Sequence, residues 1–127
     1  MAQRKNQTDH DSMVQSVVNH LSRKGYTNVK ADLQGYPRPD PIYWTGKEQE
    51  GHIPDVSADN NGHHCLFEIE TEDSISTEHT TSQLTLFAAY ANQYKKSFYM
   101  VVPKGYDGSA KEQLNRLGIT AEVWTVG

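Results

Sequence analysis

Three acidic residues in the middle of the chain have the types and the spacing of a divalent-metal site. Glu68 and Glu70 lie two residues apart in a segment with the composition of a β-strand, so we expect both side chains on one face of a sheet. Asp55 precedes them in another extended segment. The Asp-Asn-Asn-Gly sequence at positions 59–62 is typical of a hairpin turn, which would fold that segment back alongside the strand. We therefore expect the three carboxylates to converge.

A cluster of this kind is retained where a cation balances it. Carboxylates at short range repel one another, and partial burial raises the cost of their charge. Oxygen ligands without sulfur favour Mg²⁺ or Mn²⁺ over Zn²⁺. The alternative is that Glu68 and Glu70 only line the solvated side of a half-exposed strand. However, glutamate is disfavoured in strands, and Leu66, Phe67 and Ile69 beside them are apolar. The residues therefore predict a magnesium or manganese site.

Three helices are expected around this cluster. They cover about residues 8–25, 76–96 and 109–118. Thr8 or Asp9 can cap the first helix, and Ser109 can open the third with Glu112 as its capping-box partner. A glycine ends each of these two helices. The apolar stripe of the first helix consists of Val14, Val17, Val18 and Leu21.

The remaining segments predict an α/β fold. Strands are expected over residues 28–33, 52–58, 64–71, 97–103 and 119–126. The proline-rich stretch from Gly35 to Pro41 and the aromatic residues after it are expected in a loop. The order is then αβββαβαβ, with antiparallel strands first and alternating helices and strands after. This order predicts a mixed central sheet with helices on both faces.

Length and composition limit the class of protein. A chain of 127 residues has room for one domain, residues 1–127, and we expect residues 1–7 to be flexible. Cys65 is the only cysteine, so no intramolecular disulfide can form. The chain shows neither a signal peptide nor an apolar run long enough for a bilayer, which favours a cytoplasmic protein without membrane contact. The net charge of −4 argues against a bulk phosphate binder but leaves a metal-dependent nuclease open.

The acidic motif in this order of elements resembles the PD-(D/E)XK nuclease superfamily, whose fold is restriction-endonuclease-like. The residues that carry the resemblance are Ile53-Pro54-Asp55, a hairpin, and Phe67-Glu68-Ile69-Glu70. The motif is short, whereas the topology extends over nearly the whole chain. The resemblance implies that Asp55 and Glu68 bind Mg²⁺ and that the backbone carbonyl of Ile69 completes the shell. It also implies a DNA substrate and allows a homodimer.

The helix after the motif is similar to the glutamine-centred helix of RecB-type and Holliday-junction-resolvase-type members. This similarity implies that Gln83 reaches toward the metal. Alternatively, Gln83 is the capping-box partner of Thr80. Asp11 on the first helix could also approach the metal, although its position near a helix start explains it equally well.

Glu70 occupies the position at which the family carries a lysine. A carboxylate cannot polarise the scissile phosphate, but it can orient the attacking water or hold a second metal ion. Lys30, Lys95 or Lys96 could supply the missing positive charge, although each is better explained as a solvated surface group.

Two other groups of residues allow functional interpretations that are less favoured. His63, His64 and Cys65, with His52 nearby, are zinc-ligand types, but they lack the paired spacing of structural zinc sites. Tyr36, Tyr43 and Trp44, near Arg38 and Lys47, could stack on bases or could anchor the loop, and the second interpretation is favoured.

The leading expectation is a magnesium-dependent DNA endonuclease. Asp55, Glu68 and Glu70 would bind metal with the Ile69 carbonyl, and Gln83 would support them. The first alternative is an inactive nuclease-fold domain that binds nucleic acid or a protein partner. A small zinc-binding interaction module is the second.

Overall fold

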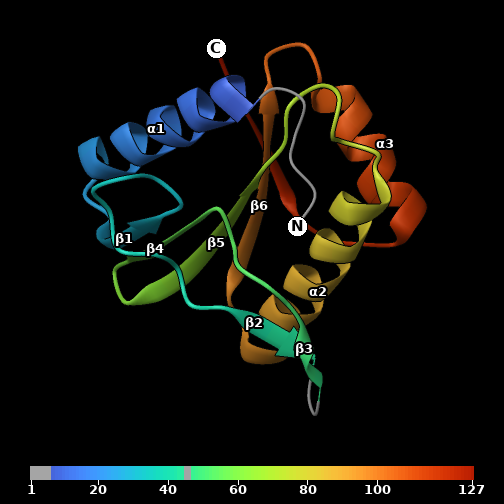
Figure 1. Cartoon of the computed structure of the whole chain (residues 1–127), viewed down its shortest axis with the longest axis horizontal. Helices are drawn as coiled ribbons and strands as arrows, with labels where there is room; N and C mark the ends of the chain where they lie inside the picture. The colour runs from blue at the N-terminus through green and yellow to red at the C-terminus, as the bar shows by residue number, and fades with distance from the viewer. Residues whose placement is uncertain (1–6, 45–46) are drawn as a thin grey trace.

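The computed structural model describes residues 7–44 and 47–127, in which a five-stranded sheet is covered by helices on both faces (Figure 1). The helices are α1 (Gln7–Arg23), α2 (Glu78–Tyr94) and α3 (Asp107–Leu117). The strands are β1 (Thr27–Ala31), β2 (Ile42–Trp44), β3 (Lys47–His52), β4 (Val56–Asn60), β5 (His63–Ile69), β6 (Ser97–Pro103) and β7 (Glu122–Val126). The predicted mixed α/β architecture is confirmed.

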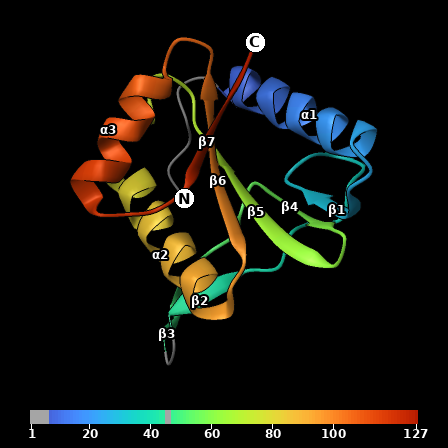
Figure 2. The same cartoon turned by 180° about the vertical axis from the view of Figure 1, so that it is seen from behind.

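The main sheet has the strand order β1-β4-β5-β6-β7. The pairs β1–β4 and β4–β5 are antiparallel, whereas β5–β6 and β6–β7 are parallel. Figure 2 shows β5 in the middle of this sheet, between the antiparallel and the parallel halves. The acidic motif therefore lies on the strand at which the two halves meet.

Two apolar clusters hold the helices to the sheet. On one face, α1 packs its predicted stripe against Phe67 and Ile69 of β5. On the other face, α2 and α3 pack against Leu66 of β5 and Met100 of β6. The ring of Phe67 also stacks on Tyr99, with centroids 4.8 Å apart. Full burial of such a side chain stabilises the fold by about 1.5–3 kcal/mol. The alternation predicted for β5 is confirmed, because its odd and even residues meet different helices.

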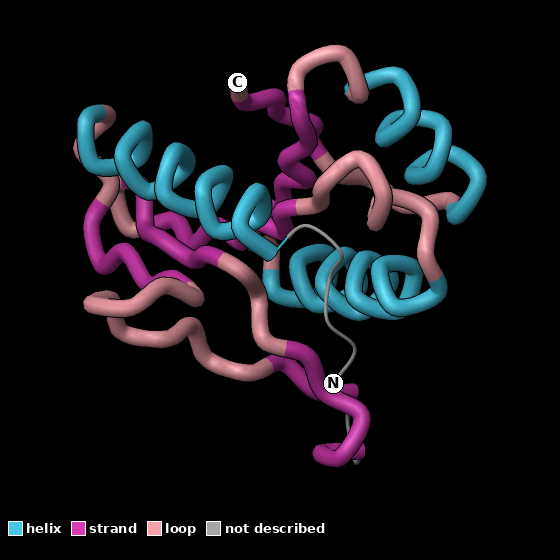
Figure 3. Tube along the Cα trace, turned by 45° about the horizontal axis from the view of Figure 1, so that its top comes forward, coloured by secondary structure: helices cyan, strands magenta, loops and turns pink. Residues whose placement is uncertain are grey.

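The hairpin formed by β2 and β3 was not predicted. Residues 35–41 contain no helix or strand, as expected, but Tyr43 and Trp44 belong to β2 rather than to a loop. This two-stranded sheet is separate from the main one and projects away from it (Figure 3). Ile42 is its buried contact with the cluster around α2.

The strand predicted over 52–58 is wrong at its start. His52 ends β3, residues 53–55 belong to no strand, and β4 begins only at Val56. Pro54 lies in this gap and cannot donate a ladder hydrogen bond, which explains the interruption. The predicted turn is confirmed, but it has fewer residues than the four predicted. Strand pairing continues to Asn60, and Asn61 and Gly62 make the turn with positive φ angles of 54° and 82°.

Several helix boundaries differ from the predicted ones. Thr8 and Asp9 lie inside α1 and do not cap it. The third helix begins at Asp107 rather than at Ser109, so the predicted capping box does not form. Helix α2 ends at Tyr94 because Lys95 adopts a left-handed conformation. Gly118 ends α3 as predicted, with a φ of 67°.

Three strand boundaries also differ. β1 ends at Ala31, two residues before the predicted end. β5 ends at Ile69, although the N–H of Glu70 still donates to β6. β7 begins at Glu122 instead of residue 119, because the N–H of Ile119 is bonded to α3 through the carbonyl of Leu114 at 2.9 Å.

The expectation of a flexible start falls almost wholly outside the described residues, which begin at Gln7 in α1. None of the described helices combines the length and the apolar composition that crossing a bilayer requires.

Candidate metal centre

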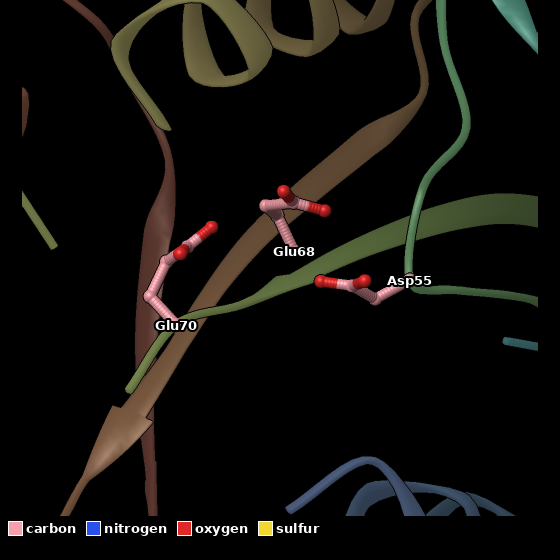
Figure 4. A group of neighbouring side chains, drawn as sticks. All are labelled: Asp55, Glu68 and Glu70. Atoms are coloured by element: carbon pink, nitrogen blue, oxygen red, sulfur yellow. The ribbon is translucent and has the colours of Figure 1, made fainter. Parts of the chain in front are cut away.

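Asp55, Glu68 and Glu70 form one buried cluster at the end of β5. Each residue contributes a carboxylate oxygen that lies within 4.8 Å of those of the other two. Only 4% of Asp55 is exposed, and neither glutamate has any exposed surface. Figure 4 shows the three carboxylates gathered around a common space. The structure therefore brings together all three side chains that the sequence identified.

The register of β4 on β5 explains why Asp55 and Glu68 are neighbours. Val56 pairs with Phe67, and the same antiparallel register continued by one step sets Asp55 opposite Glu68. Directly opposite residues of antiparallel strands share a face. Asp55 itself belongs to no strand, in contrast to the expectation, and its carbonyl accepts the Asp32 N–H at 2.9 Å.

A backbone hydrogen bond orients the Asp55 carboxylate. The N–H of Ile69 donates to Asp55 Oδ2 at 2.8 Å. Continued by two steps, the β4–β5 register sets Ile69 opposite Pro54, which has no N–H. Pro54 therefore cannot donate a ladder hydrogen bond to the Ile69 carbonyl. This is the carbonyl that the sequence resemblance assigns to the metal shell.

Glu70 is held by backbone and hydroxyl groups. Its N–H donates to the carbonyl of Val101 at 2.9 Å, which continues the β5–β6 ladder one residue past β5. Its Oε1 lies 2.7 Å from Ser74 Oγ and 3.0 Å from Thr80 Oγ1. Both hydroxyl residues are buried. Neither was identified from the sequence, because hydroxyl residues near a helix start are usually explained as caps.

His10 is the third residue that sequence reasoning missed. It is fully buried on α1, and its Nε2 lies 3.3 Å from Asp55 Oδ2. Asp11, the residue considered instead, is half-exposed and contacts His10 Nδ1 at 3.6 Å. The sequence did contain a signal, since His10 precedes Val14 by four residues and so extends the apolar stripe. A histidine on such a stripe needs a polar partner inside the fold.

Gln83 lies on the helix face that meets the cluster. It follows Thr80 by three residues and is buried, and its Oε1 has no hydrogen-bond partner among the described residues. The capping-box explanation is wrong, because the cap of α2 is Thr77, which accepts the N–H of Thr80 at 3.2 Å. No hydrogen bond joins Gln83 to the three carboxylates in the described part of the chain.

The lysines suggested as substitutes for the motif lysine lie elsewhere. Lys30 Nζ is 3.6 Å from Asp40 Oδ1, and Asp40 is exposed. Lys95 and Lys96 follow the far end of α2. Lys95 is 15 residues from Thr80, which corresponds to about 22 Å along a helix axis.

The candidate zinc residues have other partners. His63 Nε2 lies 2.8 Å from Ser97 Oγ, and His64 Nδ1 lies 2.7 Å from Asp59 Oδ1. The hydrogen bond from His64 is the main reason why the pKa of Asp59 is lowered. Cys65 is buried in the cluster against α1. Within residues 7–44 and 47–127, the three carboxylates are the only group of three or more metal-ligand side chains found close enough to share an ion.

The aromatic residues near the proline-rich stretch divide into two kinds. Tyr36 is half-buried and packs against the cluster around α1, which fits the anchoring interpretation. Tyr43 and Trp44 are 45% and 38% exposed on the β2–β3 hairpin. His52, at the end of β3, contacts Ser82 of α2 at 2.8 Å.

The donor set and spacing of the cluster fit a hard divalent ion. Oxygens bound to one Mg²⁺ lie about 2.1 Å from it and hence up to about 4.2 Å from one another. The 4.8 Å limit on the distances between these oxygens exceeds that span by at most about 0.6 Å, which small side-chain rotations can close. All three donors are carboxylates, the ligand type that Mg²⁺ and Mn²⁺ prefer.

Comparisons of this chain with protein-family models, with curated proteins and with solved structures find no match. The geometry of the carboxylate cluster is therefore the basis on which a function can be proposed.

Proposed function

We propose that this chain is a metal-dependent phosphodiesterase acting on DNA, built on the restriction-endonuclease-like fold of the PD-(D/E)XK nucleases. The observation that carries the proposal is the buried convergence of Asp55, Glu68 and Glu70 where β4 begins and β5 ends. The elements of the main sheet follow the αβββαβαβ order, with the β2–β3 hairpin inserted after the first strand. This order is the one expected for the fold.

The state of the Ile69 carbonyl gives further support. A backbone carbonyl inside a sheet normally accepts a hydrogen bond from an N–H of the neighbouring strand. Here the β4–β5 register, continued by two steps, sets Ile69 opposite Pro54, which has no N–H to donate to this oxygen. Two carboxylates and one backbone carbonyl would then bind the ion. Magnesium usually keeps several waters in addition to such ligands, and one of these waters can be the nucleophile.

The residues divide the work between them. A bound Mg²⁺ or Mn²⁺ would neutralise the phosphate oxygens and lower the pKa of its water. Asp55 and Glu68 would hold that ion. Glu70 would orient the attacking water and accept its proton, or it would hold a second ion. Gln83, which is buried on α2 three residues after Thr80, would support the shell.

Glu70 also favours a second candidate function. A chain without the motif lysine could bind the ion and nucleic acid without cleaving, as a nuclease-fold domain that has lost its chemistry. The two candidates make the same prediction for metal binding and differ in turnover.

A cleavage assay separates them. Plasmid, linear, branched and single-stranded DNA are incubated with the protein in Mg²⁺ and then in Mn²⁺. Glu68→Gln removes one ligand charge with little change in shape. Glu112→Gln makes the same change on the exposed surface of α3 and is the matched control.

Metal-dependent cleavage by the wild type and by Glu112→Gln, with loss in Glu68→Gln, is the expected result. Metal binding that depends on Glu68, without cleavage of any substrate, would select the binding domain instead. Cleavage that persists in Glu68→Gln would contradict the proposed site.

A further inference from the structure

Two buried hydroxyls converge on one oxygen of Glu70. Ser74 Oγ donates to Glu70 Oε1 at 2.7 Å, and Thr80 Oγ1 approaches the same atom at 3.0 Å. Ser74 lies in the loop between β5 and α2, and Thr80 lies in the first turn of α2. Both residues are buried, with exposed fractions of 8% for Ser74 and 1% for Thr80. Glu70 is therefore held from two separate elements in a buried site.

The direction of the surrounding hydrogen bonds shows what kind of group this arrangement is built for. Ser74 Oγ accepts the backbone N–H of Thr71 at 3.0 Å, so its own proton is directed elsewhere. Thr80 Oγ1 accepts from Thr77 Oγ1 at 3.0 Å. The proton of Thr80 is shared between Glu70 Oε1 and the carbonyl of Ser74, which lies 2.6 Å away. The Ser74 proton can go to Glu70 Oε1 or to the carbonyl of Thr71, which is 3.2 Å away, and Glu70 Oε1 is the nearer acceptor. Both hydroxyls can thus donate to Glu70 Oε1, an arrangement that suits a carboxylate.

We propose that Ser74 and Thr80 are positioning residues that present Glu70 to the cation bound by Asp55 and Glu68. The inference rests on the proposed metal site. On this account, Glu70 is an acidic member of the site with its own supporting hydroxyls, rather than a lysine position that has merely lost its lysine.

Positioning of this kind affects metal affinity more than folding. Hydrogen bonds to a carboxylate in a buried site fix its orientation and strengthen in the low local dielectric. Removal of such an outer partner usually weakens metal binding by about 10- to 100-fold. Thr80 also holds the Ser74 carbonyl, so loss of its hydroxyl loosens both contacts to Glu70.

The test compares Mn²⁺ affinity across matched variants of the full chain. Thr80→Val keeps the shape of the side chain and removes the hydroxyl, whereas Thr80→Ser keeps the hydroxyl. Ser74→Ala removes the second donor. Thr85→Val is the control, because Thr85 lies on the same helix, is exposed and donates only to the carbonyl of Thr81. Free Mn²⁺ is measured by electron paramagnetic resonance during titration, and the melting temperature without metal is recorded for each variant.

The expected result is about tenfold weaker Mn²⁺ binding in Thr80→Val and in Ser74→Ala, with wild-type affinity in Thr80→Ser and Thr85→Val. If Thr80→Val and Ser74→Ala melt earlier but bind Mn²⁺ as tightly as the wild type, the hydroxyls are structural and the inference is overturned. A wild-type chain that binds no Mn²⁺ overturns both this inference and the proposed metal site. Unchanged affinity in these two variants, beside lost affinity in Glu68→Gln, overturns the inference alone.

Discussion

The carboxylate of Asp55 takes the place of a backbone carbonyl at the end of β5, where its Oδ2 accepts the N–H of Ile69 at 2.8 Å. In a continuous ladder, the residue opposite Ile69 would be Pro54. The interruption of β4 at Pro54 therefore has two effects. It lets a side chain enter the end of the sheet, and it leaves the carbonyl of Ile69 without a donor from the opposite strand.

Replacement of this proline tests the second effect. Pro54→Ala supplies an N–H that can bond the Ile69 carbonyl and extend the β4–β5 ladder. The added hydrogen bond, of about 1 kcal/mol, and the lost rigidity of proline, of about 0.4–1 kcal/mol, nearly cancel in the free energy of unfolding. We expect Mn²⁺ affinity to fall about fivefold, since the carbonyl must then give up a bond of that size. Calorimetric titration measures the affinity, and hydrogen exchange reports whether the new amide is protected. A protected amide with unchanged affinity would show that the carbonyl is not a ligand.

Two substitutions of Asp55 separate its structural role from its ligand role. Asp55→Asn keeps an oxygen that can accept the Ile69 N–H but removes the charge, so we expect nearly wild-type folding and no Mn²⁺ binding. Asp55→Ala leaves that buried N–H without its acceptor, which costs about 1–3 kcal/mol of unfolding free energy. Urea denaturation and Mn²⁺ titration of both variants check the prediction. Equal destabilisation by the two substitutions would show that the hydrogen bond contributes little.

His10 is expected to be important for the stability of the apo protein. It is fully buried and lies 3.3 Å from Asp55 Oδ2, so His10→Ala creates a cavity on α1 and removes a polar contact. We expect a loss of about 2–4 kcal/mol in the unfolding free energy. His20→Ala on the same helix is the control. His20 is only partly buried and makes an edge-to-face contact with Trp124. We therefore expect His20→Ala to lower the unfolding free energy less than His10→Ala does. Similar losses in the two variants would contradict the role assigned to His10.

His52 gives the fold a specific pH dependence. Burial, followed in size by repulsion from His79, lowers the pKa of His52 below its usual 6.5. The folded state therefore favours the neutral ring, and the unfolded state binds the proton more readily. The stability that follows is fully present above pH 6.5 and is lost as the pH falls toward the lowered pKa. His52→Asn can keep a hydrogen bond to Ser82 without a titrating ring. Its urea midpoint therefore changes less between pH 7.5 and 5.5, which lie about one unit on either side of the usual histidine pKa of 6.5. Equal changes in both proteins would contradict the assignment.

The sequence predicted the parts of the site that depend on local periodicity. Glu68 and Glu70 share a face because strand side chains alternate, and Asn61 and Gly62 make the turn because both tolerate positive φ. These features need no knowledge of distant residues. The convergence of Asp55 with the glutamates followed from the same two facts.

Contacts across the fold could not be predicted in this way. His10 is 45 residues from Asp55 in the chain, and only the packing of α1 on the sheet brings them together. Thr80 reaches Glu70 because Thr77 caps α2 and Thr80 lies in its first turn, whereas the sequence offered Thr80 itself as the start of a capping box with Gln83. The β2–β3 hairpin was missed because its strands are short and follow a run of prolines, which local rules assign to a loop.

The most direct test of the metal site is anomalous diffraction from crystals grown with Mn²⁺. Data collected at the manganese absorption edge locate the ion without any assumption about its ligands. We expect a strong peak within bonding distance, about 2.0–2.3 Å, of carboxylate oxygens of both Asp55 and Glu68. The absence of a peak among the three carboxylates at saturating Mn²⁺, or a peak elsewhere on the chain alone, would contradict it.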